Sequence, residues 1–98
     1  MMFKVIARGF TQTYDRWTDA LNVAKSLMPQ CKWFDEIRIV AQEDLIWVYS
    51  RSHKFPQFIG PGTYDRLARL FIAETMTAAA EALADQAAET TDDLDAVN

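Results

Sequence analysis

The sequence predicts a single small α+β domain, on three observations. A length of 98 residues is typical of one domain. Half of the residues are apolar and 12% are aromatic, which is enough for one packed core. Segments that alternate between apolar and polar residues, typical of strands, are interspersed with segments in which apolar residues recur every three or four positions, typical of helices. We expect the order β-α-β-β-α, with a three-stranded, largely antiparallel sheet and two helices packed on one of its faces.

The first half of the predicted domain is a strand, a loop and a helix. Apolar and polar residues mostly alternate over residues 2–8, which predicts a strand, and Gly9 permits a turn after it. Residues 10–17 are polar with irregularly spaced rings, so we expect a loop. A helix should then begin with Thr18 as its cap, because an apolar stripe with helical spacing follows. Pro29 is expected to end this helix.

A hairpin and a second helix complete the prediction. Residues 36–42 alternate, residues 43–44 can form the turn, and residues 45–50 are apolar on both faces, which indicates an inner strand. Residues 52–62 contain the remaining prolines and glycines and are expected to form a loop. Thr63 can cap the second helix, in which apolar residues again recur every three or four positions.

Charge is divided unevenly along the chain. All ten Lys and Arg side chains lie in residues 1–70, together with seven of the fourteen Asp and Glu, so this part carries +3 and residues 71–98 carry −7. We predict a folded domain over residues 1–88 and a frayed, acidic, flexible tail over residues 89–98. The end of the second helix is rich in alanine, which allows close approach, and we hypothesise that two copies form a homodimer through it.

Several classes of function are not expected. The sequence contains no apolar run long enough to cross a membrane and no leader, so we expect a soluble, cytoplasmic protein without a membrane partner. A lone Cys31 and a lone His53 provide neither a disulfide framework nor an ordinary metal site. No nucleophile lies in a catalytic context, so we expect a protein that is not an enzyme and has no cofactor.

The favoured prediction is a protein–protein interaction module that occupies a surface of a larger partner, as an inhibitor or an assembly factor. More rings are concentrated between the hairpin and the glycine turn than a small sheet can enclose. Exposed Trp, Tyr and Arg side chains are typical of interface hot spots. The predicted partner-binding residues are Trp33, Phe34, Trp47, Arg51, Lys54, Phe55 and Phe58.

Two alternatives remain open. The same mixture of rings and basic residues could bind single-stranded nucleic acid by stacking and charge attraction. The segment from Gly60 to Thr63 leads into a helix N-terminus, where free amides and the helix dipole favour an anion or a nucleotide. The residues predicted for such a site are Gly60, Gly62, Thr63 and Arg66.

Overall fold

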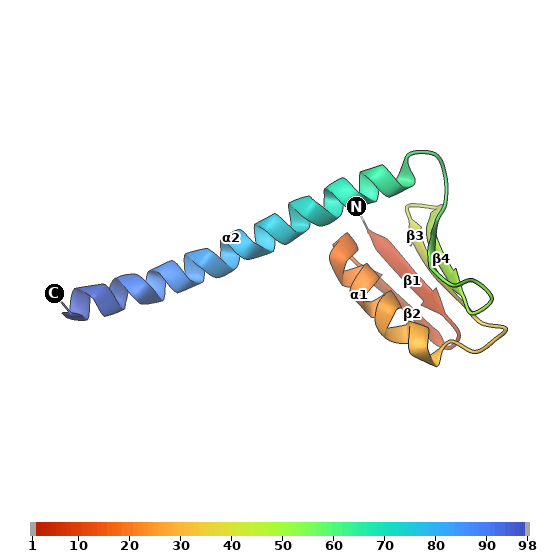
Figure 1. Ribbon diagram of the computed structural model, residues 1–98, viewed down its shortest axis with the longest axis horizontal. Helices are drawn as coiled ribbons and strands as arrows, with labels where there is room; N and C mark the ends of the chain where they lie inside the picture. The colour runs from red at the N-terminus through yellow and green to blue at the C-terminus, as the bar shows by residue number, and fades with distance from the viewer. Residues whose placement is uncertain (1, 98) are drawn as a thin grey trace.

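The computed structural model describes residues 2–97 of the chain, with side-chain environments over residues 2–85. Within this part the elements follow one another as β1 (Phe3–Ala7), β2 (Phe10–Tyr14), α1 (Trp17–Leu27), a 3-10 turn η1 (Met28–Gln30), β3 (Glu36–Ala41), β4 (Asp44–Ser50), β5 (Gln57–Phe58) and α2 (Thr63–Val97), as Figure 1 shows. The predicted α+β class is confirmed.

The sheet has five strands among the described residues, in the order β2-β1-β3-β4-β5, and every neighbouring pair is antiparallel. The prediction of a three-stranded sheet is therefore wrong. Residues 10–14 form the edge strand β2 because Phe10 and Tyr14 pack against the core, while the three polar residues between them are exposed. The two-residue strand β5 lies inside the predicted loop and is too short to show a pattern.

A β-bulge explains why the fourth strand is apolar on both faces. Ile39 pairs with Trp47 and Val40 pairs with Leu45, which leaves Ile46 as an extra residue on β4. Ile46 and Trp47 are consequently both buried, each with 1% of its surface exposed. The predicted inner position of this strand is confirmed, because β4 lies between β3 and β5.

Helix α1 packs on the sheet, but it begins differently from the prediction. The helix starts at Trp17, and Arg16 at the cap position makes no side-chain hydrogen bond. The carboxylate of Glu74 in α2 instead accepts hydrogen bonds from the backbone amides of Trp17 (2.9 Å) and Thr18 (2.7 Å). The prediction that Thr18 caps this helix is wrong, since the capping group comes from 57 residues further along the chain.

Helix α2 crosses the N-terminal end of α1 and then extends away from the rest of the fold (Figure 1). Leu67 in its second turn is part of the buried core. The extension accounts for overall dimensions of 63 × 29 × 23 Å. The predicted boundary between a domain and an acidic tail, at residue 88, lies within this helix. Asn98 and the side chains of residues 86–97 lie outside the described part, so this boundary stays a prediction.

Candidate functional site

Two loops meet at one end of the sheet, at the start of β3 and the end of β4. They lie side by side because Glu36 pairs with Ser50 in the sheet. The Nη1 atom of Arg51 also donates a hydrogen bond to the backbone oxygen of Cys31 (3.1 Å), which joins the two loops. We call the exposed side chains of these loops the tip surface; its members are Lys32, Trp33, Phe34, Arg51, Lys54 and Phe55.

Three large rings of the tip surface are exposed to solvent. The exposed fractions are 63% for Trp33, 92% for Phe34 and 73% for Phe55. Holding a large apolar side chain in water forgoes roughly 1.5–3 kcal/mol relative to burying it. A cluster of such side chains on one part of a surface is typical of an interaction site.

The loop that carries two of these rings is held by its own polar groups. The Sγ atom of the buried Cys31 donates to the backbone oxygen of Asp35 (3.2 Å), and the amide of Asp35 donates to the backbone oxygen of Lys32 (2.9 Å). Burial, followed by the negative charge of Asp35, raises the pKa of the Cys31 thiol. This cysteine is therefore a buried structural donor, with little thiolate at neutral pH.

The charge around the exposed rings is positive. Two nearby arginines are each paired with a carboxylate: Arg8, in the turn after β1, with Asp35 at 3.6 Å, and Arg38, on β3, with Glu36 at 2.8 Å. No carboxylate of residues 2–85 lies within ion-pair distance of Lys32, Arg51 or Lys54. The tip surface thus combines apolar rings with a basic rim.

His53 lies next to this surface in a local hydroxyl cluster. Its Nδ1 atom is 2.7 Å from the Oγ atom of Ser50 and 3.4 Å from that of Ser52. Ser50 ends β4, and Ser52 and His53 lie in the turn that follows it. In the described chain no carboxylate hydrogen-bonds to the ring. A serine activated for nucleophilic attack needs a histidine that a third group orients, so this cluster orders the turn.

Two predicted contact residues lie away from the tip surface. Trp47 is buried in the core with 1% exposure, because it pairs with the buried Ile39 on the core face of the sheet, so its prediction as a partner contact is wrong. Phe58 is half-buried, and its ring meets that of Tyr64 edge to face at a centroid distance of 5.0 Å. Phe58 instead lines a groove between α1 and α2.

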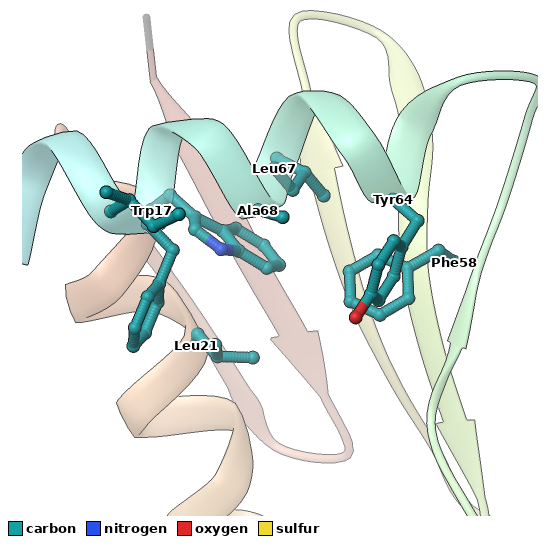
Figure 2. Close-up of a pocket in the computed structure, with 8 residues that line it drawn as sticks. Trp17, Leu21, Phe58, Tyr64, Leu67 and Ala68 are labelled. Carbon is teal, nitrogen blue, oxygen red and sulfur yellow. The ribbon is translucent and has the colours of Figure 1, made fainter.

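This groove has a volume of about 260 Å³ and is almost entirely apolar. Figure 2 shows Trp17 and Leu21 of α1 on one side and the first turns of α2 above them, with Phe58 and Tyr64 at one end. The sequence placed the apolar residues of α2 in a core stripe, but Tyr64 is 63% exposed, Phe71 41% and Ile72 57%. The signal that indicates their exposure is length, because α2 continues well beyond the sheet that it could cover.

The glycine turn before α2 uses its donors internally. Thr63 is buried with 5% exposure, its hydroxyl donates to the backbone oxygen of Ile59 (2.6 Å), and its amide donates to that of Gly60 (3.4 Å). The amide of Arg66 donates to the backbone oxygen of Gly62 (3.1 Å). Thr63 therefore anchors the turn through its hydroxyl, and both of its donors already have partners within the turn.

Other kinds of site find little support in the described residues. Among the side chains described, no three His, Cys, Asp or Glu gather closely enough to hold a metal ion. Neither helix, over the same residues, has both the length and the hydropathy needed to cross a bilayer.

Comparison of the chain with known protein families, with curated proteins and with solved structures found no match.

Proposed function

We propose that this protein is a non-enzymatic interaction module that binds a larger protein through its tip surface. The observation that supports this most strongly is the exposure of Trp33, Phe34 and Phe55 on two hydrogen-bonded loops. Rings presented on a fixed loop lose little conformational freedom on binding, so more of their burial free energy contributes to affinity. Occupation of a partner's surface is sufficient for either an inhibitor or an assembly factor.

The chemistry of the tip surface indicates what kind of partner surface it fits. Trp and Arg are enriched among interface hot spots, where a ring fills a pocket and polar groups surround it. The rings would enter an apolar pocket, and Lys32, Arg51 and Lys54 would face a rim of carboxylates. The target is therefore a protein with an apolar, acid-rimmed depression.

The test is affinity capture from the native host with wild-type protein and two variants, followed by binding measurements on the purified partner. Trp33→Ser combined with Phe34→Ser should weaken partner binding by roughly 10³-fold, since two hot-spot side chains contribute about 2 kcal/mol each. Met2→Ser, a change at an exposed apolar residue outside the tip surface and α2, is the matched control and should leave binding intact. A partner that binds the double variant as tightly as the wild type would overturn the proposal.

Binding of single-stranded nucleic acid is a second candidate, because the same rings could stack on bases while the basic rim meets phosphates. Trp17 and Trp47 are buried and Trp33 is 63% exposed, so quenching of Trp33 fluorescence reports on this surface. Titration with oligothymidylate should then show quenching that weakens steeply as salt rises, owing to counterion release. An absence of quenching at low salt would eliminate this candidate.

A further inference from the structure

We propose that two copies of this chain pair antiparallel through α2, with the second half of each helix lying in the groove between α1 and α2 of the other copy. The tip surface takes no part in this contact, since it lies on the loop before β3 and the loop after β4. Three features of α2 support the pairing: an apolar stripe that nothing in the described chain covers, the spacing of that stripe, and the distribution of charge.

The stripe runs along one side of α2 and continues past the sheet. Ala68, Ile72, Met76, Ala79 and Leu83 follow one another at intervals of four, four, three and four residues. An 11-residue repeat of this kind keeps apolar residues on one side of a nearly straight helix. Ile72, Met76 and Leu83 have exposed fractions of 57%, 66% and 64%.

The spacing is symmetric, which is what an antiparallel pair of identical helices requires. The stripe reads the same in both directions about a point between Thr77 and Ala78, so Ile72 of one copy lies opposite Leu83 of the other, and Met76 lies opposite Ala79. Each long side chain at the centre then meets an alanine, which allows the helices to approach closely. In the same register, Leu83 reaches the groove at Ile72.

The groove supplies the receiving surface. Its lining is apolar, and its volume of about 260 Å³ is large enough for aliphatic side chains. Trp17, Phe58, Phe71 and Ile72 are among the residues that line it, and Figure 2 shows Trp17 and Phe58 beneath the first turns of α2. Leu83 of the second copy, together with the alanines that surround it in the sequence, matches this apolar lining.

Charge selects the antiparallel direction. The first half of α2 has no net charge, because two acidic residues balance Arg66 and Arg69, whereas every charged residue of its second half is acidic, beginning with Glu81 and Asp85. An antiparallel pair keeps the two acidic halves apart, while a parallel pair would place acid beside acid.

The available area is also sufficient for a stable contact. Within residues 63–85 the exposed large apolar residues of α2 present on the order of 600 Å² per copy (Tyr64, Phe71, Ile72, Met76 and Leu83), so a pair that covered them completely would bury about 1,200 Å², the lower end of stable interfaces. A weak to moderate dimer is the expected outcome.

The first test is sedimentation and light scattering of the full chain over a concentration series. The wild type should approach twice 11.2 kDa as concentration rises. Met76→Glu and Leu83→Glu should each weaken association at least ~10-fold, and circular dichroism should show an intact fold because both side chains are exposed. Phe34→Ser is the control and should dimerise as the wild type does. A wild type that stays monomeric at high concentration, or glutamate variants that dimerise normally, would overturn the pairing.

The second test concerns direction. Oxidation of a mixture of Met76→Cys and Ala79→Cys chains should favour the mixed disulfide, because these positions face each other in the antiparallel register. Preferential self-crosslinking of Met76→Cys chains would indicate a parallel pair and contradict the arrangement. Since neither test involves the tip surface, loss of this dimer is distinguishable from failure of the proposed function.

Discussion

At the scale of single residues, Glu74 shows how one side chain can join distant parts of the chain. The first amides of α1 have no carbonyl partner within their own helix, and a carboxylate satisfies them while also meeting the positive end of the helix dipole. Sequence analysis placed this role on Thr18 because such caps are usually local. Here Glu74 lies in α2, so the same contact that caps α1 also sets where α2 crosses it.

Replacing Glu74 by Ala should therefore lower the free energy of unfolding by about 1–2 kcal/mol, since two backbone donors lose a charged acceptor. Urea unfolding at low protein concentration measures this change. Glu81→Ala is the matched control on the same helix, because Glu81 is exposed and accepts none of the hydrogen bonds described in residues 2–85, and it should change stability little. Equal effects of the two substitutions would contradict the capping role.

The buried thiol of Cys31 makes a prediction about pH. Burial raises its pKa, so the folded state holds the thiol proton more tightly than the unfolded state does. The resulting stability is fully present below the ordinary thiol pKa of 9.0 and is lost as pH rises above it. The wild type should thus lose stability relative to Cys31→Ala when denaturation curves are compared at neutral pH and above pH 9.0. A stability difference that stays constant across this range would show that folding does not raise the pKa of this thiol, and would contradict the prediction.

At the scale of elements, the turn into α2 depends on two glycines with different surroundings. Gly60 has φ +98°, and a Cβ atom there would lie 3.0 Å from the Oγ1 atom of Thr63, which is buried and hydrogen-bonded. Gly62 has φ +71°, and a Cβ atom there would meet open space. Both positions favour glycine by backbone conformation, but only Gly60 adds a steric conflict.

Gly60→Ala should consequently destabilise the protein more than Gly62→Ala. We expect a loss of roughly 1–3 kcal/mol at position 60, from backbone strain and displacement of Thr63, and about 1 kcal/mol at position 62. Thermal unfolding followed by circular dichroism ranks the two variants, and Gly62→Asn, which accepts a positive φ more readily, is the mild control. The reverse ranking would indicate that the Thr63 hydroxyl does not hold this turn.

The strands and helices also differ in whether the sequence pattern predicts them. Alternation predicted β1, β3 and β4, and helical spacing predicted both helices, because each of these segments is long enough to show a period. Strand β2 was missed because three exposed polar residues separate its two packed rings. Strand β5 was missed because two residues show no period. Edge strands of this kind acquire their structure from the neighbour that they pair with.

At the scale of the whole molecule, the two exposed apolar surfaces lie at different ends of the fold. The tip surface belongs to loops that flank the Glu36–Ser50 pair, whereas α2 begins beside the opposite end of β4, where the amide of Ile59 donates to the backbone oxygen of Ile46 (3.0 Å). An α2-paired dimer would therefore leave both tip surfaces free. Such a dimer would present two copies of the binding site and increase the avidity of the module for a multivalent partner.

The candidate site was foreseen in part. Trp33, Phe34 and Phe55 are exposed, as the expected surplus of rings requires, and they lie near Arg51 and Lys54. Alternation along the strand indicates a core position for Trp47 as well, and the structure buries it; the burial of Ile46 beside it was not foreseeable, since it depends on a bulge that pairs Ile39 with Trp47 and Val40 with Leu45. The groove was missed for a related reason, because its two walls come from α1 and α2 and the sequence does not show how these helices cross.

The amino-acid sequence alone determined the fold class, the periodic elements, the acidic character of residues 71–98 and the excess of rings near the hairpin. These properties follow from local spacing and composition, which each segment carries by itself. Only the tertiary structure decided the five-stranded order, the capping of α1 by Glu74, the burial of Ile46 at the bulge and the exposed stripe of α2. The physical reason is that burial and hydrogen bonding join residues far apart in the chain, and a segment's own pattern does not identify its partner.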